Sequence, residues 1–278
     1  MLLRVLGTKQ LLRRRLPSLA AAAIVASALG AGATGASAAT SGAAGARSLP
    51  PSVGPVAQPA AADAPIAPVG RRRATVAQVV APVVARRRPD ERARAVWKVP
   101  IATGWSEQSQ VLLVLRSQVD ETGRRWLEVE LPIRPNGTTG WIPDDYVRLA
   151  TTRYWIDVDL RKRLVTILRD GRPARRFAAV IGRPSTPTPR GLFAVWEMNR
   201  QPDPGGFLGP WAVPITALSN VLERYGGGPG RVAIHGRAGT SFRDPLGSAR
   251  SHGCIRVDNS NIVWLVRHVP RGTPVEIR

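Results

Sequence analysis

The sequence predicts a mainly β protein, and three kinds of observation support this fold class. Apolar and polar residues alternate at 127–131 and 156–160, which is the period of half-buried strands. Turn signals such as Asp120–Gly123 and Pro135–Gly137 punctuate the chain. Helical spacing of apolar residues occurs in one segment of the expected folded region, after Asp258. We therefore expect many short strands and a single helix.

The first 38 residues have the organisation of a signal peptide. Basic residues precede an apolar stretch from Leu16 to about Gly32, and Ala36-Ser37-Ala38 supplies the small residues that signal peptidase reads. The alternative is a retained membrane anchor, because signal peptides and membrane anchors share this pattern. The rest of the chain has no apolar run of roughly 18 residues that could span a bilayer. We expect an exported protein of the cell wall, the periplasmic space or the extracellular medium.

Residues 39–92 predict a disordered linker. Ala, Pro, Val, Ser and Gly dominate this segment, and it contains no Trp, Tyr or Phe to anchor a core. Arginine runs at Arg71–Arg73 and Arg86–Arg88 interrupt it. These runs are either an electrostatic contact with the wall or plain solvated charge.

Residues 93–150 predict a small β-domain. Val111–Leu115 has the length of a buried strand, and the alternating segment 127–131 follows a turn. The spacing of Trp126 and Gly140-Trp141-Ile142-Pro143 resembles a bacterial SH3-like domain, which implies a small β-barrel. Such a barrel could bind wall or peptide ligands. The alternative is a β-subdomain that only packs on the unit that follows.

Residues 151–278 predict a second β-rich unit. Its helix begins at Asp258-Asn259, runs through apolar positions up to Val266 and ends before Pro270. The strands expected around it lie at 156–160, 164–168, 177–181, 192–196 and 275–277.

Cys254 is the only cysteine of the chain and lies in Ser251-His252-Gly253-Cys254, with fifteen residues between His235 and Ser251. A thiol with a pKa of about 8.5 becomes a nucleophile when a histidine takes its proton. Backbone amides beside Gly253 could stabilise the oxyanion of an attacked carbonyl. Spacing alone leaves open whether His252 or His235 is the base. An inert buried thiol is one alternative; a zinc site is another, but it would have three ligands and no evident fourth.

His235 and Ser251–Cys254 together resemble the signature of the L,D-transpeptidase catalytic domain, the YkuD family, over residues 153–278. Other segments extend the match: Tyr154–Val158, Arg169–Gly171, Val180–Gly182 and Thr188–Phe193. The resemblance implies a β-sandwich catalytic domain with Cys254 as the nucleophile. It also implies that His235 is the general base, with its ring oriented by the carbonyl of Gly236.

The resemblance assigns further roles around the thiol. The amides of His252, Gly253 and Cys254 would form the oxyanion pocket, and Ser251 and His252 would shape the site. The family pattern often ends in asparagine where this chain has Arg256, so contacts with the acceptor could differ.

The implied reaction joins two peptidoglycan tetrapeptide stems, one as donor and one as acceptor. Cysteine attacks the donor, D-alanine leaves, and an amine of the acceptor resolves the thioester to give a 3→3 cross-link. No metal or organic cofactor is implied. The same thioester resolved by water would make the protein an L,D-carboxypeptidase, and a non-catalytic wall-binding protein is the alternative of another class.

The net charge of +21 predicts polyanionic partners. For an exported chain, anionic cell-wall polymers and lipid headgroups are the expected polyanions. We expect no nucleic-acid partner, because that role conflicts with export. Contact with a membrane is expected only through the N-terminal segment, if it is not cleaved.

Overall fold

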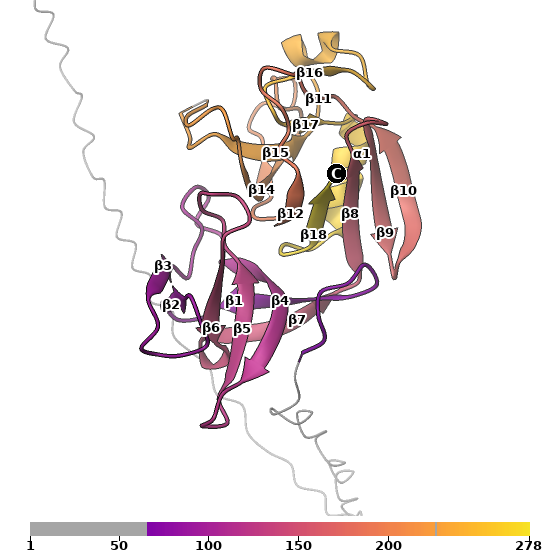
Figure 1. Ribbon diagram of the computed structural model, residues 1–278. Coiled ribbons are helices and arrows are strands. Elements are labelled where there is room, and N and C mark those ends of the chain that lie inside the picture. Colours follow the sequence, from indigo (N-terminus) through magenta and orange to yellow (C-terminus); the bar gives the residue numbers. More distant parts are fainter. Residues whose placement is uncertain (1–65, 226) are drawn as a thin grey trace, which may run out of the picture. The chain divides into compact units, whose positions relative to one another are not determined.

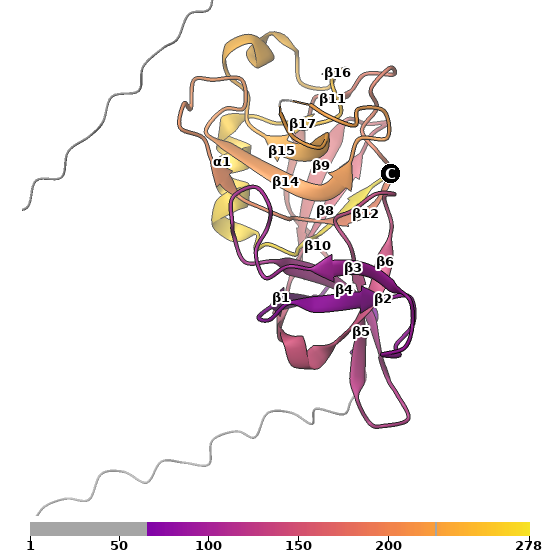
Figure 2. The ribbon, with the colours of Figure 1, turned by 90° about the vertical axis from the view of Figure 1, so that its left-hand side faces the viewer.

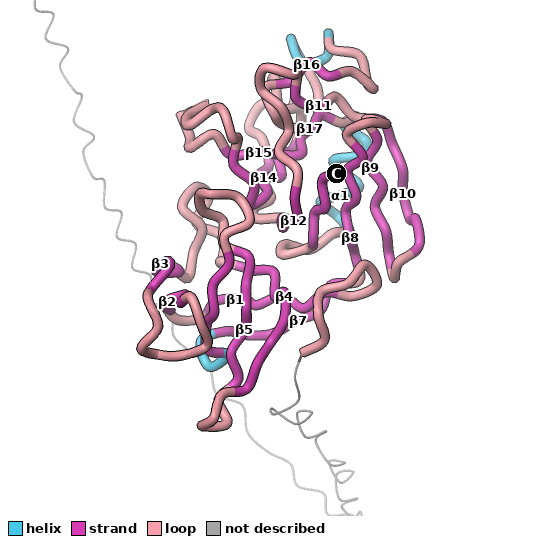
Figure 3. The backbone as a smooth tube through the Cα atoms, in the orientation of Figure 1, coloured by secondary structure: helices cyan, strands magenta, loops and turns pink. Residues whose placement is uncertain are grey.

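A computed structural model describes residues 66–225 and 227–278 (Figure 1). The expected signal peptide and residues 39–65 of the expected linker lie outside the described residues. Within the described ranges a single α-helix, α1 (Asn259–His268), stands among eighteen strands and two short 3-10 turns (Figure 3). The mainly β fold with one helix is therefore confirmed.

The N-terminal strands form one seven-stranded antiparallel sheet in the order β3-β2-β6-β5-β4-β1-β7. Its strands are β1 (Ala74–Val79), β2 (Val83–Arg86), β3 (Ala95–Val99), β4 (Val111–Val119), β5 (Arg125–Glu130), β6 (Thr139–Pro143) and β7 (Val147–Thr152). One face buries a core of Val, Leu, Ile and Ala side chains contributed by six of the strands. This sheet is the N-terminal β-domain that the sequence predicts.

The prediction that residues 39–92 form a disordered linker is wrong at the C-terminal end of this segment. Residues 74–86 form β1 and β2, and Val79 and Val83 are buried in the core of the sheet. Alternation of valine and alanine was sufficient to form strands without an aromatic residue, since the core they enter is supplied by β4 and β5. The arginine runs Arg71–Arg73 and Arg86–Arg88 flank these strands.

The second region contains three sheets. A five-stranded sheet has the order β10-β9-β8-β18-β12, a four-stranded sheet has the order β13-β14-β15-β17, and β11 pairs with β16. The bounds are β8 (Tyr154–Asp159), β9 (Leu164–Arg169), β10 (Arg172–Ala178), β11 (Ile181–Gly182), β12 (Gly191–Ala194), β13 (Asn199–Arg200), β14 (Trp211–Leu218), β15 (Arg231–His235), β16 (Ala249–Ser251), β17 (Ile255–Arg256) and β18 (Pro274–Ile277). The strands expected at 156–160, 164–168, 192–196 and 275–277 are present within two residues, whereas the one expected at 177–181 is divided between the end of β10 and β11. The strands β13 to β17 are additional.

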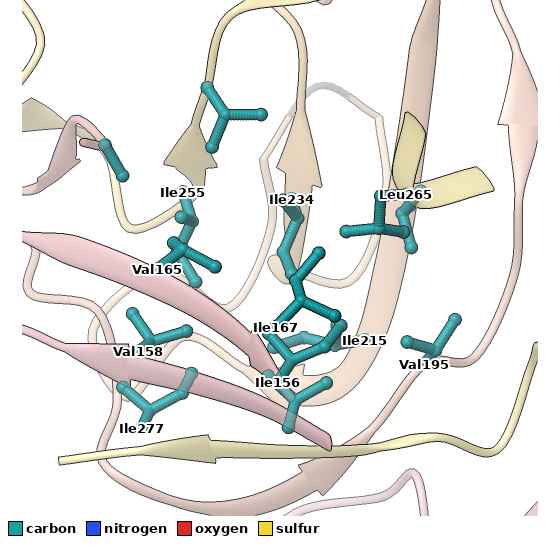
Figure 4. Close-up of a cluster of buried hydrophobic side chains, with 14 of the residues drawn as sticks. Ile156, Val158, Val165, Ile167, Val195, Ile215, Ile234, Ile255, Leu265 and Ile277 are labelled. Atoms are coloured by element: carbon teal, nitrogen blue, oxygen red, sulfur yellow. The ribbon is translucent and has the colours of Figure 1, made fainter. Parts of the chain in front are cut away.

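One hydrophobic core joins the two larger sheets of this region. Ile156 and Ile167 of the five-stranded sheet and Ile234 and Ile255 of the four-stranded sheet belong to the same buried cluster (Figure 4). Leu265 of α1 completes it, and α1 packs against β14 and β15 (Figure 2). This core fixes the position of β15 and β17, the strands that hold the candidate site.

None of the helices within residues 66–225 and 227–278 has the length and apolar character needed to cross a bilayer.

Candidate active site

Parallel pairing of β15 with β17 brings His235 and Cys254 onto one face of a sheet. Ile234 pairs with Ile255 and His235 with Arg256, so Cys254 lies level with Ala233. Side chains alternate between the two faces of a strand, and the two isoleucines point into the core. His235, Cys254 and Arg256 therefore share the opposite face. The backbone of Ala233 also interacts with the thiol, which agrees with the two residues lying level.

His235 is held as a neutral imidazole of defined tautomer. Its side chain is buried, with 1% of its surface exposed, and Nδ1 lies 2.7 Å from the carbonyl oxygen of Gly236. Because a carbonyl can only accept, Nδ1 carries the hydrogen and the lone pair of the neutral ring is on Nε2. Burial lowers the pKa of His235 to about 4, and the carbonyls of Gly236 and Leu208 only partly offset it. The ring is ready to accept a proton at neutral pH.

Cys254 is partly exposed and rests as a thiol. Loss of water around the sulfur raises its pKa, while the hydrogen bond with Ala233 and the charge of Arg256 act in the lowering direction. Arg256 is 3% exposed, forms an ion pair with Asp244, and its guanidinium lies 4.8 Å from the ring centroid of Phe207. The fixed positive charge favours thiolate once a base takes the proton.

Ser251 ties together the turn that presents the thiol. It is fully buried, its Oγ donates to the carbonyl oxygen of Cys254 at 2.6 Å, and the same Oγ accepts the amide of Gly253 at 3.1 Å. Gly253 has φ +118, a backbone conformation that other residues rarely adopt. The amide of Gly253 is therefore engaged, which leaves the amides of His252 and Cys254 as candidate oxyanion donors.

Two threonines complete the support of this turn, and the sequence interpretation gave them no role. Thr188 Oγ1 donates to the carbonyl of Gly253 and accepts the amide of Gly182, both at 2.9 Å. Thr186 Oγ1 donates to the carbonyl of Ser251 at 3.4 Å. The segment Thr188–Phe193 contributed to the family resemblance, but the resemblance assigned no role to either threonine.

The start of α1 fixes the residue that orients His235. Asn259 Oδ1 accepts the amide of Arg237 at 2.8 Å, and a Cβ on Gly236 would lie 2.3 Å from that oxygen. Asp258 occupies the N-cap position as predicted, but its carboxylate accepts from Arg237 at 3.0 Å and makes no cap hydrogen bond. The helix start therefore clamps the segment after His235.

His252 lies at the rim of the site. Its ring stacks on Tyr225 with 5.3 Å between centroids, and the Tyr225 hydroxyl lies 3.4 Å from Nδ1. Desolvation and the charges of Arg183 and Arg256 lower the pKa of His252. The third histidine, His268, stacks on Trp264 at the end of α1 and takes no part in the site.

Metal coordination would need more ligands than gather here. Among residues 66–225 and 227–278, no three His, Cys, Asp or Glu side chains form a cluster that could hold a metal ion.

Comparison with known proteins places this arrangement in a family. Residues 153–277 match the model of the L,D-transpeptidase catalytic domain, YkuD. Two relatives bear the name "Putative L,D-transpeptidase YkuD": one from Bacillus licheniformis is 35% identical over 46% of this chain and 67% of its own length, and one from Bacillus subtilis is 33% identical over 49% and 70%.

A solved L,D-transpeptidase from Mycobacterium smegmatis is 19% identical, covering 65% of this chain and 93% of its own, with a TM-score of 0.38. That score is low, so the assignment rests on the two Bacillus relatives and the family model. Residues 153–277, which the family model matches, contain both His235 and Ser251–Cys254. The chain therefore belongs to the YkuD family of L,D-transpeptidases, which act on peptidoglycan peptides.

Proposed function

We propose that this chain is an exported enzyme that joins peptidoglycan tetrapeptide stems by 3→3 cross-links through a thioester on Cys254. The observation that carries the proposal is the placement of a neutral, buried His235 at the end of β15 and of Cys254 immediately before the neighbouring parallel strand β17. Cys254 is the chain's only cysteine, so it is the only residue that could form the thioester.

The first half of the reaction transfers the donor stem to the enzyme. Nε2 of His235 takes the thiol proton, and the thiolate attacks the carbonyl carbon between the third stem residue and the terminal D-alanine. The amides of His252 and Cys254 stabilise the oxyanion that forms, and Arg256 stabilises the thiolate before attack. The carbon–nitrogen bond then breaks, and His235 returns the proton to the amine of the departing D-alanine.

The second half transfers the stem to its acceptor. An amine of a neighbouring stem attacks the thioester carbonyl, loses a proton to His235, and the carbon–sulfur bond breaks to regenerate the thiol. Water in place of the amine would give a trimmed tripeptide stem, which is the carboxypeptidase outcome. Each half uses the same pair of residues, and each begins from a neutral imidazole and ends with the proton returned.

The N-terminal region and the net charge of the whole chain add three further proposals. Residues 1–38 direct export, residues 74–152 form a domain that we expect to be SH3-like, and the +21 charge favours anionic wall polymers as partners. Exposed arginines between β2 and β3, namely Arg87, Arg88 and Arg94, supply some of this charge.

Product analysis separates the outcomes. Purified protein is incubated with disaccharide-tetrapeptide, and the products are identified by mass spectrometry, with Cys254→Ala as the control. A 3→3 dimer with release of D-alanine supports transpeptidation. Free tripeptide alone would assign the carboxypeptidase activity, and no turnover would assign a wall-binding protein without catalysis. Full activity in Cys254→Ala would overturn the mechanism.

A further inference from the structure

One segment of the catalytic region connects the active site with the N-terminal sheet. The segment between β14 and β15, here called the strap, comprises residues 219–225 and 227–230. Its base is closed by the amide of Ser219, which donates to the carbonyl of Gly230 at 2.8 Å. Its tip carries Tyr225, whose amide and carbonyl both bond with Gly228 at 3.0 Å. Tyr225 is the residue that stacks on His252.

The N-terminal sheet holds the base of the strap through the connection between β5 and β6. The guanidinium of Arg134 donates to three strap carbonyls, those of Ser219, Leu222 and Pro229, at 3.1 Å or less. Asn136 adds hydrogen bonds in both directions with Leu218, at 2.7 and 2.9 Å, just before the strap begins. One charged side chain thus donates hydrogen bonds to carbonyl groups at both ends of the strap.

A second connection of the N-terminal sheet contacts the tip. The indole of Trp105, between β3 and β4, packs so closely on Gly228 that a Cβ there would lie 2.6 Å from the ring. The loop that carries Trp105 is itself anchored on the catalytic region: the amide of Ser106 donates to Glu197 at 3.2 Å, and Gln108 donates to the carbonyl of Met198 at 3.0 Å.

The strap has few restraints of its own besides its internal hydrogen bonds. Gly227 and Gly230 have φ of +84 and +68, and glycine restricts the backbone less than any other residue. Tyr225 is 44% exposed, so burial contributes little to fixing its ring. Contacts from the N-terminal sheet therefore add to the strap's own hydrogen bonds in keeping Tyr225 against His252.

We infer that the N-terminal sheet is a positioning element of the active site: Arg134, Asn136 and Trp105 hold the strap, and the strap holds Tyr225 against His252. This inference rests on the proposed function, because the stacked pair forms the rim over which a stem peptide would approach Cys254. Arg134 touches no reacting atom and acts through Tyr225. The expected consequence is weaker binding of the stem peptide, with little change in the chemical step.

Steady-state kinetics with disaccharide-tetrapeptide test the consequence. Arg134→Ala is expected to raise KM about fivefold, the change that roughly 1 kcal/mol of lost binding energy produces, with kcat within about twofold of the wild type. Arg116→Ala is the matched control, because Arg116 pairs with Glu128 inside the same sheet. The Tyr225→Ala variant should reproduce the KM of Arg134→Ala, and the double variant should show no further rise. A KM of the double variant that rises by the product of the two single effects would overturn the inference.

NMR of the histidine ring protons, recorded without substrate, tests the positioning itself. The stacked Tyr225 ring should shield the His252 protons, and both Tyr225→Ala and Arg134→Ala should shift them downfield, whereas Arg116→Ala should not. An unchanged His252 signal in Arg134→Ala would contradict the inference. If Arg134→Ala does not fold, Trp105→Ala is measured instead, because Trp105 is 60% exposed. Since this readout needs no turnover, an inactive wild type would refute the proposed function and leave the positioning test intact.

Discussion

The two histidines near Cys254 occupy contrasting surroundings. His235 lies in the floor of the site, buried by the sheet and fixed by the carbonyl of Gly236. His252 lies at the rim, partly exposed and stacked on Tyr225. His235 has one defined tautomer and a lowered pKa. His252 instead presents a polar ring that is held by its stacking on Tyr225. We therefore propose that His235 acts in the chemical step and that His252 acts in binding.

Replacing the floor histidine should have the largest effect. His235→Gln keeps a polar side chain but provides no base at neutral pH, so we expect kcat to fall by about 10²- to 10⁴-fold with KM little changed. His252→Gln should mainly raise KM. Steady-state kinetics of both variants check this, and a larger loss of kcat in His252→Gln would reverse the two roles.

The buried His235 should also make the stability of the fold depend on pH. Its pKa is about 4 in the folded protein and 6.5 for an unperturbed histidine, so the unfolded chain binds the extra proton first as the pH falls. The free energy of unfolding should be fully retained above pH 6.5 and should decrease towards pH 4, by about 3 kcal/mol in total.

Urea unfolding of the wild type and of His235→Gln at pH 7 and pH 4 isolates this contribution from that of other titrating groups. The difference between the two proteins should change over the interval from 6.5 to 4. An identical pH dependence in both would show that His235 is not desolvated in the folded protein. For the same reason, kcat/KM should remain high below about pH 6, where an exposed histidine would already be protonated.

Loss of the Ser251 hydroxyl should have an intermediate effect. Ser251→Ala leaves the carbonyl of Cys254 and the amide of Gly253 without their partner, which should cost about 1–3 kcal/mol of stability. Thr152→Val is the matched control, because it removes a buried hydroxyl that bonds with Thr273. The rate at which iodoacetamide alkylates Cys254 should differ from the wild-type rate in Ser251→Ala and not in Thr152→Val. A wild-type rate in Ser251→Ala would mean that Ser251 only stabilises the fold.

The smallest expected effect concerns the hydroxyl of the rim tyrosine. Tyr225→Phe keeps the ring that stacks on His252 and loses only the 3.4 Å contact with Nδ1. We expect KM to change less than about twofold, because this contact is at the limit of hydrogen-bonding distance. A rise as large as that in Tyr225→Ala would assign rim binding to the hydroxyl and not to the ring.

Local patterns predicted much of the fold and some of the site. Strands such as β8 and β9, and helix α1, were predictable because alternation and helical spacing are short-range signals. The strands at 74–86 were missed because alanine, valine and arginine also compose linkers. The choice between His235 and His252 could not be made from spacing, since it depends on the parallel pairing of β15 with β17. The contacts of Arg134 with the strap join residues 85 or more positions apart and leave no sequence motif.

Intact-protein mass spectrometry during reaction with disaccharide-tetrapeptide tests the central claim most directly. The account predicts a covalent adduct that corresponds to the disaccharide-tripeptide, located on the peptide that contains Cys254. The adduct should be absent in Cys254→Ala and should form much more slowly in His235→Gln. An adduct on another residue, or cross-linked product from Cys254→Ala, would contradict the account.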